Sequence, residues 1–285
     1  NMKLEKSSSG HHYFVSGKGE PLILLHGFPD CAENYFHQLE FFSSKGFQVF
    51  APFMPGYHPE DAELDTYQSL RISEEIIKFS RSVTDRKINL VGHDWGAAVA
   101  YGIAGLAPEL VNKLVAVSVP HGPNLGESFI ADGDQQRKSW YMFFFQLPMA
   151  DLAVSTNNFS FIDRLWTDWS PNWPEYKVYC DRTIEILSQE NVLSKALAYY
   201  RSTFQPSLQS DRVNQMQEKI GMNKIRPPTL YLHGENDGCI AANLSEGMEA
   251  NFEDLEIKIL PDCGHFLHLE KPDEVNRIIL DFLSD

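Results

Sequence analysis

The segment INLVGHDWGAAVA, residues 88–100, constrains the fold of this chain more than any other feature. An apolar run leads through Gly92 into a short turn at Asp94, and Gly96 then opens a helix-like stretch of small residues. Glycines on both sides of the turn allow a strand and a helix to pass close together. The segment predicts a sharp strand-turn-helix unit whose tip carries Asp94 near a helix N-terminus, where an anion is favoured.

Short apolar runs alternate with helical patterns elsewhere in the chain. The strand-like runs are Pro21–Leu25, Phe47–Pro52, Lys87–Val91, Leu114–Val119, Thr229–His233 and Leu255–Leu260. Helical patterns lie near Tyr35–Ser44, Tyr67–Ser82, Gly96–Ala107 and Pro272–Leu283. Continuous apolar runs of this length are typical of strands buried on both faces. The sequence therefore predicts an α/β fold with a mostly parallel central sheet flanked by helices.

The alternation stops between about His121 and Lys224. This window is helical in character, and it holds four of the five tryptophans: Trp140, Trp166, Trp169 and Trp173. We expect residues 121–224 to form a helical cap inserted between two strands, and residues 1–120 and 225–285 to form the core domain. Such a cap would cover the sheet edge where open α/β folds bind ligands. An independent helical domain beside the sheet is the alternative.

Composition narrows the range of partners. The formal net charge of -15 comes from 39 acidic and 24 basic residues, which disfavours nucleic acid and anionic membrane surfaces. The four cysteines are scattered, which favours reduced thiols over a metal site, although one disulfide stays open. No apolar stretch follows the N-terminal MKLEKSSSG, so we expect a cytoplasmic protein, with a homodimer open as an alternative to a monomer.

An aspartate at the tip of the turn changes the chemistry expected there. Its reference pKa is about 3.9, so Asp94 is ionised at neutral pH without the help of a base. Attack by a carboxylate on an acyl carbon gives an anhydride, whereas attack on an alkyl carbon gives an ester that water can hydrolyse. The expected substrates are therefore epoxides or alkyl halides. The alternative is a structural Asp94 that caps the helix.

Two further strand ends supply an acid and a base. Asp237 follows the apolar run TLYLH, and His265 follows LEIKIL, so the chain order is nucleophile, acid, histidine. His265 would activate water, and Asp237 would hold its tautomer and stabilise the imidazolium. Alternatives stay open for both roles: Glu235 for the acid, and His93, His233 or His268 for the base.

The motif HGFP, residues 26–29, follows the first apolar run. It matches the type of loop that supplies one backbone N–H of an oxyanion hole, while the residue after the nucleophile supplies the other. Phe28 and Trp95 are therefore the expected donors, and their side chains are free to shape a pocket.

Over essentially its whole length the chain resembles the epoxide hydrolase branch of the α/β-hydrolase superfamily. HGFPD (residues 26–30), GHDWGA (92–97) and GHFLHLEKP (264–272) carry the resemblance. It implies an α/β-hydrolase fold and opening of an epoxide to a diol, through an ester on Asp94 that His265 and Asp237 hydrolyse. It implies a small apolar substrate such as an epoxide, and no cofactor or metal.

The resemblance also implies two catalytic tyrosines in the cap. Tyr141 opens the family's Y-x-x-x-F-Q pattern, and Tyr200 stands immediately before an arginine. In the family these phenols point at the epoxide oxygen, and a reference pKa near 10 makes both proton donors. The alternative is that both belong to aromatic core stripes. Ala32 and the loop Phe53–His58 depart from the family pattern, which leaves the pocket size open.

Four other functions are alternatives to epoxide opening. A haloalkane dehalogenase would share the Asp94 nucleophile and Trp95, but it would want a second halide donor where this chain has Phe28. A haloacid dehalogenase would want arginine at the position of Trp95. A small-molecule receptor on the same fold has no need of a water-activating histidine, and fold alone does not decide between enzyme and receptor. A serine esterase is disfavoured, since no G-x-S-x-G occurs.

Overall fold

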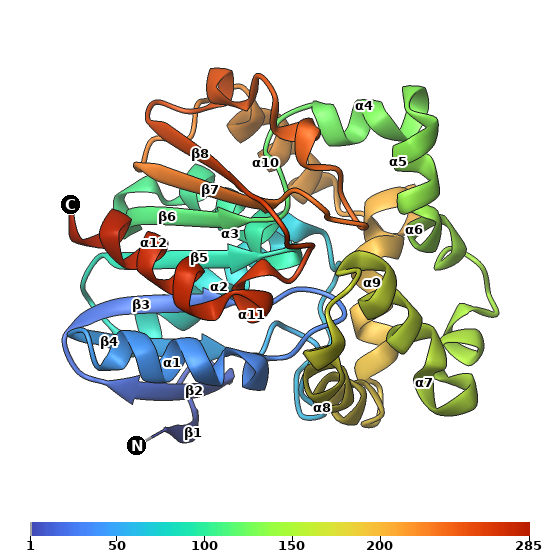
Figure 1. Cartoon of the computed structure of the whole chain (residues 1–285), viewed down its shortest axis with the longest axis horizontal. Helices are drawn as coiled ribbons and strands as arrows, with labels where there is room; N and C mark the ends of the chain where they lie inside the picture. Colours follow the sequence, from blue (N-terminus) through green and yellow to red (C-terminus); the bar gives the residue numbers. More distant parts are fainter. Residues whose placement is uncertain (1) are drawn as a thin grey trace.

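The computed structural model describes residues 2–285, and its centre is an eight-stranded sheet (Figure 1). The strand order is β1-β2-β4-β3-β5-β6-β7-β8. The strands are β1 (Lys3–Lys6), β2 (His12–Gly17), β3 (Glu20–Leu25), β4 (Phe47–Pro52), β5 (Ile88–His93), β6 (Val111–Val117), β7 (Thr229–Gly234) and β8 (Leu255–Leu260). Strands β3 to β8 pair in parallel, and β1 and β2 add an antiparallel edge. The predicted fold class is confirmed.

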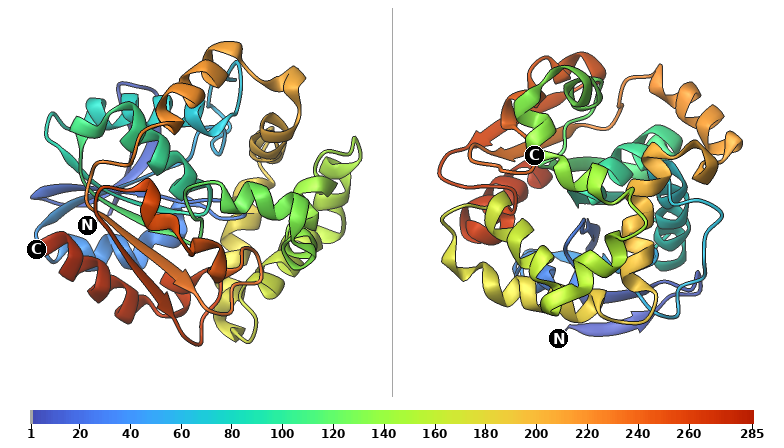
Figure 2. Two further views of the ribbon diagram at one scale, coloured as in Figure 1. Left: turned by 90° about the horizontal axis from the view of Figure 1, so that it is seen from above. Right: turned by 90° about the vertical axis from the view of Figure 1, so that its right-hand side faces the viewer.

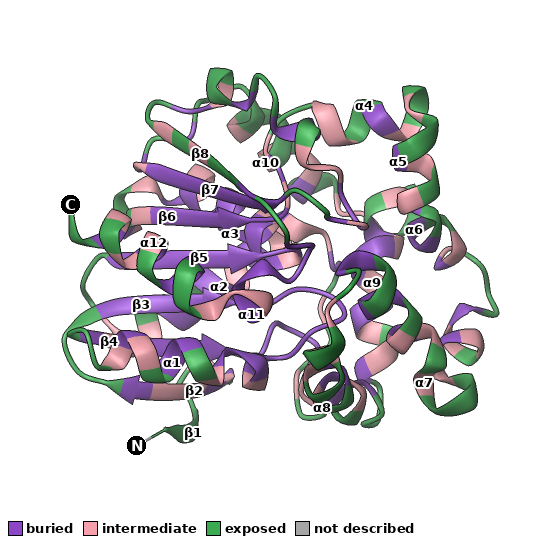
Figure 3. Cartoon of the chain, in the orientation of Figure 1, coloured by how far each residue is buried: buried purple, intermediate pink, exposed green. Residues whose placement is uncertain are grey.

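Helices cover both faces of the sheet. Helices α1 (Phe36–Ser43) and α12 (Pro272–Ser284) pack together in front of it in Figure 1, and α2 (Ser69–Val83) and α3 (Trp95–Leu106) lie behind it. The central strands β3 and β5 are almost entirely buried, as Figure 3 shows. Burial on both faces explains why these strands read as unbroken apolar runs.

Two strands differ from the sequence prediction. The β1–β2 hairpin was not predicted, because all four residues of β1 are exposed and leave no hydrophobic pattern to detect. Strand β8 was predicted to be buried on both faces and is not. It forms the far edge of the sheet, and its residues from Leu255 to Ile259 are exposed or half-buried.

The segment between β6 and β7 is helical and stands beyond the ends of the strands, at the right of Figure 1. Its helices are α4 (Asn124–Ala131), α5 (Gly133–Lys138), α6 (Trp140–Phe144), α7 (Ala150–Trp169), α8 (Lys177–Leu187), α9 (Val192–Phe204) and α10 (Asp211–Gly221). Helix α7 is interrupted, because Asn157, Asn158 and Phe159 adopt left-handed backbone angles. Figure 2 shows α4 to α9 curving around the sheet edge, whereas α10 packs on α2 and α3.

Short helices complete the connections. They are η1 (Ala32–Tyr35), η2 (Pro108–Leu110), η3 (Pro174–Tyr176), η4 (Pro206–Leu208), η5 (Ala242–Ser245), η6 (Met248–Asn251) and α11 (Leu267–Glu270). Within residues 2–285 all four cysteines are buried and unbridged. None of the helices in that range has the length and hydrophobicity needed to cross a bilayer.

Candidate active site

Asp94 occupies the tip of a strained turn between β5 and α3. Its backbone angles, φ 57° and ψ -123°, lie outside the regions that L-residues usually adopt, a cost that folds tend to keep at functional sites. The close approach is visible at Gly96, where an added Cβ would lie 2.2 Å from the Leu25 oxygen. The Asp94 side chain accepts no hydrogen bond from the first turn of α3. Asp94 therefore stands at the N-cap position of α3, but its side chain does not cap the helix.

The two carboxylate oxygens of Asp94 have different partners. The Phe28 amide donates to Oδ1 at 2.8 Å, and His265 Nε2 lies 3.1 Å from Oδ2. The loop after β3 thus brings the predicted amide of Phe28 to the nucleophile. Among residues 2–285 no hydrogen bond joins the Trp95 amide to this carboxylate, so the second oxyanion donor stays a prediction.

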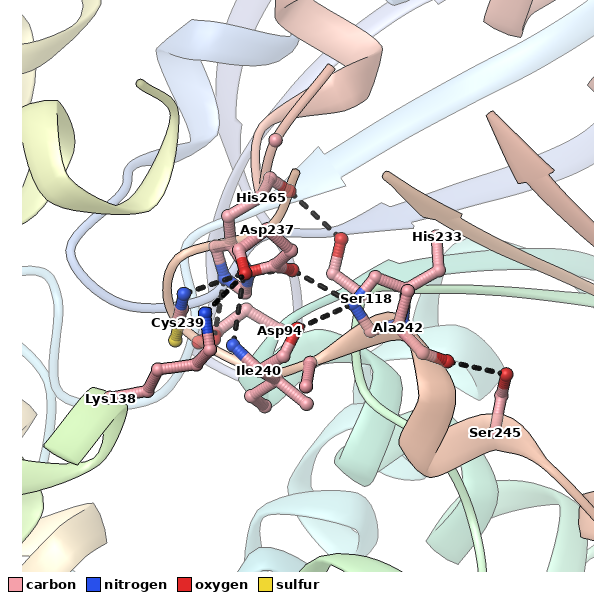
Figure 4. A network of polar contacts seen from close by, with 12 residues as sticks. Asp94, Ser118, Lys138, His233, Asp237, Cys239, Ile240, Ala242, Ser245 and His265 are labelled. Carbon is pink, nitrogen blue, oxygen red and sulfur yellow. Dashed lines mark hydrogen bonds and ion pairs between the residues drawn. The ribbon is translucent and has the colours of Figure 1, made fainter. Parts of the chain in front are cut away.

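Asp237 and His265 meet behind Asp94, as Figure 4 shows. His265 Nδ1 lies 2.8 Å from Asp237 Oδ2, while Asp237 Oδ1 accepts hydrogen bonds from the amides of Cys239 at 2.7 Å and Ile240 at 2.9 Å. A carboxylate that accepts this many hydrogen bonds in a fully buried position is held in one orientation. Asp237 therefore fixes the imidazole so that Nε2 faces Asp94.

Burial and charge set the protonation of this group. Burial alone would lower the pKa of His265, but the charges and hydrogen bonds of Asp237 and Asp94 outweigh it and raise that pKa to about 10. Burial alone would raise the pKa values of Asp94 and Asp237, yet their contacts with His265 hold both below the ordinary range. In the free protein the group thus consists of two carboxylates sharing one imidazolium.

The alternative histidines have other partners. His233 Nε2 donates to both Asp237 Oδ2 and the Ile240 carbonyl at 2.9 Å, which leaves its Nδ1 to accept from the Tyr231 hydroxyl at 2.6 Å. His93 Nε2 donates to the His265 carbonyl at 2.8 Å. Both rings therefore hydrogen-bond to the loops around the site and not to Asp94.

His268 and Glu235 also stand apart from the reacting group. His268 makes no hydrogen bond with Asp94 or Asp237 among the residues described, and burial lowers its pKa well below the usual range. Glu235 is exposed to solvent, so it lacks the buried contact with an imidazole that Asp237 has. The geometry therefore favours Asp237 and His265 over every alternative that the sequence left open.

The backbone of the cap also reaches the site, which the sequence did not predict. The Trp169 carbonyl, at the end of α7, accepts from the amides of both Gly238 and His265 at 3.0 Å. An added Cβ would meet cap backbone at 1.9 Å from Gly238 and at 2.7 Å from Gly264. The loops that carry the acid and the base are thus packed directly against the cap.

The two predicted tyrosines lie side by side under the cap. Tyr141 on α6 and Tyr200 on α9 are buried, and their rings meet edge to face with centroids 5.7 Å apart. Tyr200 also contacts the Trp95 ring at 5.1 Å, and the Tyr141 hydroxyl lies 3.2 Å from Cys239 Sγ. Burial raises the pKa of each phenol well above its usual value, so both are protonated donors.

A cavity of about 220 Å³ reaches Asp94. Asp94, Trp95 and Tyr200 line one part of it, and the rest is mostly apolar: Ala98, Val119, Leu125, Phe129, Met142, Phe204 and Ile240. A larger groove of about 750 Å³ along α3 does not touch Asp94, but it shares lining residues such as Ala98 and Phe129 with the cavity. Ala32 and the loop Phe53–His58 do not line the cavity, so their departures from the family pattern do not set its size.

The chain is similar to several known proteins. Residues 20–272 match the family model described as alpha/beta hydrolase fold. The chain is 30% identical to human "Epoxide hydrolase 4" over 297 residues, covering all of this chain and 78% of the relative. It is also 30% identical to "Epoxide hydrolase 3" of Xenopus tropicalis, covering 77% of that protein. Among solved structures, an inhibitor complex of Bacillus megaterium epoxide hydrolase superposes with a TM-score of 0.82 at 26% identity, covering 99% of this chain and 100% of that one.

Proposed function

The chain belongs to the α/β-hydrolase family, in the branch that holds the epoxide hydrolases, and on that premise we propose that it opens an epoxide to a vicinal diol through an ester on Asp94. The observation that carries the proposal is the contact of Asp94 with both the Phe28 amide and His265. A carboxylate in this position is a nucleophile toward alkyl carbon, and the neighbouring imidazole is available for the hydrolysis that follows.

In the first step Asp94 Oδ2 attacks a ring carbon and the carbon–oxygen bond of the epoxide breaks. The hydrogen bond from Phe28 retains Oδ1 as the future carbonyl oxygen of the ester, which leaves Oδ2 free to react. The alkoxide takes a proton from Tyr200 or Tyr141, whose burial keeps them protonated. Tyr200 lines the cavity beside Asp94 and is the better placed of the two.

In the second step water attacks the carbonyl carbon of the ester, and His265 takes one proton from that water. The bond between the acyl carbon and Oδ2 then breaks, the diol leaves with the second proton of the water, and the Asp94 carboxylate is restored. Esterification removes the negative charge of Asp94, which is one of the two charges that raise the pKa of His265. The pKa of His265 therefore falls once the ester forms, and the ring gives up its proton, which restores the phenol that protonated the alkoxide. The neutral ring is then a base when a base is needed. Asp237 then stabilises the imidazolium, and the Phe28 amide stabilises the developing oxyanion.

The tyrosine pair favours an epoxide over an alkyl halide. A halide leaves without needing a proton, whereas the alkoxide of an opened epoxide stays attached and must be protonated. The protonated phenol of Tyr200 in the cavity wall, with the Tyr141 ring packed against it, suits that second need. The complete set of nucleophile, acid and base likewise favours an enzyme over a receptor. The mostly apolar lining supports a small apolar substrate.

A single turnover in heavy-oxygen water tests the mechanism. With enzyme in excess over styrene oxide, we expect unlabelled diol and heavy oxygen in the peptide that contains Asp94. His265→Gln should stop the second step and leave an adduct on that peptide, measurable by mass. Label in the diol at the first turnover, with no adduct in His265→Gln, would mean that water attacks the epoxide directly and that Asp94 is not the nucleophile.

A substrate panel tests the class of reaction. Aryl and aliphatic epoxides should be opened to diols, and short haloalkanes should release little halide. Faster halide release than diol formation across the panel would favour a dehalogenase. No turnover of either class, with tight binding of a panel member, would favour a receptor.

A further inference from the structure

Cys239 brings a thiol into the catalytic group. It follows Asp237 by two residues, and the hydrogen bond from its amide to Asp237 Oδ1 turns its side chain back toward the nucleophile. One ligand atom from each of Asp94, Cys239 and His265 lies within 4.8 Å of the other two, and all three residues are buried. The mechanism proposed above does not use this thiol.

Sulfur, imidazole nitrogen and carboxylate oxygen together form a ligand set that suits zinc. Zinc binds such ligands at about 2.0 to 2.3 Å in a tetrahedron, so neighbouring ligand atoms lie about 3.3 to 3.6 Å apart. His265 Nε2 and Asp94 Oδ2 are already 3.1 Å apart, and the sulfur needs to approach by at most about 1.2 Å. Mg²⁺ and Ca²⁺ prefer all-oxygen sites and gain little from the thiol or the imidazole.

Charge and access also favour a cation here. The carboxylates of Asp94 and Asp237 contact the two ring nitrogens of His265, so two acidic side chains lie together in this buried group. The 220 Å³ cavity leads to Asp94, which gives an ion a path to the group. Carboxylates in a buried position attract a nearby cation more strongly than they would in water.

We propose that Asp94, Cys239 and His265 form an inhibitory binding site for a thiophilic divalent cation such as Zn²⁺. Coordination displaces the thiol proton and the Nε2 proton to solvent, leaving thiolate and neutral imidazole on the metal. The bound ion occupies the attacking oxygen and the water-activating nitrogen together, so both steps stop. Inhibition rests on the function proposed above, whereas binding of the metal does not.

Cobalt is the probe for binding, since a cobalt–thiolate bond absorbs in the near ultraviolet and needs no substrate. The full-length protein should develop this band at one equivalent of Co²⁺, and Zn²⁺ should abolish it by displacement. Cys239→Ser and Cys239→Ala should both lack the band, with folding checked by circular dichroism. Cys263→Ser is the matched control, because Cys263 is also buried and lies two residues before His265, yet is outside the ligand set. That variant should keep the band.

Inhibition is measured in parallel on epoxide opening. Zn²⁺ should inhibit the wild type, and EDTA should restore its activity. Mg²⁺ should not inhibit. Because loss of even an outer-shell partner costs about 10- to 100-fold in metal affinity, the Cys239 variants should need at least about tenfold more Zn²⁺. No cobalt band, or equal zinc sensitivity in wild type and Cys239→Ser, would overturn the site. A cobalt band that depends on Cys239 in a protein without epoxide turnover would uphold the site and refute the proposed function.

Discussion

Replacement of Asp237 by Asn should separate the two steps of the reaction. The buried carboxylate accepts two amide hydrogen bonds on Oδ1 and two imidazole contacts, from His233 and His265, on Oδ2. If the Asn oxygen keeps the amides, its NH₂ group faces both imidazole N–H groups. His233 Nε2 keeps the Ile240 carbonyl as an acceptor, whereas the N–H at His265 Nδ1 loses its only one, so the free energy of unfolding should fall by about 1 to 3 kcal/mol.

The effect on catalysis follows from the tautomer of His265. An Asn NH₂ group favours a ring that accepts at Nδ1 and carries its proton on Nε2, which leaves no lone pair to take a proton from water. The comparable substitution in a serine protease triad lowers kcat by about 10⁴-fold. Ester formation depends on the ionised Asp94 and the two phenols and not on the tautomer of His265, so we expect its rate to stay within about tenfold of wild type.

Rapid mixing with styrene oxide followed by intact-protein mass measurement checks this separation. Asp237→Asn should accumulate the ester at close to one equivalent, while diol appears slowly. Glu235→Gln is the matched control: the same chemical change, on the same loop, at an exposed carboxylate, and it should behave as wild type. Full turnover by Asp237→Asn without an accumulated ester, or an equal loss of both steps, would refute the assignment of Asp237.

Three further outcomes are expected. Tyr200→Phe should slow ester formation by about tenfold to a hundredfold, and Tyr141→Phe by less, because the Tyr141 hydroxyl is already engaged by a thiol; equal rates in both variants and wild type would make the tyrosines structural. The rate of ester formation should not change between about pH 5 and 9, because the pKa of Asp94 is lowered and those of the phenols are raised. The rate of ester hydrolysis should fall as decreasing pH protonates His265. Stopped-flow measurements of the two rates check this, and the opposite pattern would contradict it. Gly264→Ala should cost about 1 to 3 kcal/mol in urea unfolding, because its Cβ would lie 2.7 Å from cap backbone, while Gly133→Ala, with nothing within 4 Å, should not.

The reacting residues could be predicted from sequence because each follows a strand. Asp94 comes after β5, Asp237 after β7 and His265 five residues after β8, and the carboxyl ends of parallel strands meet at one edge of the sheet. Strong apolar runs mark those strand ends in the sequence. The positions of the three residues after predicted strands were therefore enough to predict that they lie close together.

Contacts that depend on the cap could not be predicted in the same way. Trp169 acts through its main-chain carbonyl, which every residue has, so no side-chain pattern marks it. Cys239 looked like one of four scattered cysteines, and only the turn after Asp237 directs it to the site. The apolar residues of β8 likewise predicted a strand buried on both faces, although some of them are exposed.

The seam at Trp169 determines which part of the cap can move. Because it joins backbone to backbone, no rotation of side chains can loosen it, and the end of α7 must travel with the loops of Gly238 and His265. Entry and release of ligands are then left to the opposite side of the cap, where the cavity and the groove along α3 share Phe129. The amides of Gly238 and His265 should exchange their hydrogens only on global unfolding, whereas the amides of α4 should exchange faster through local opening.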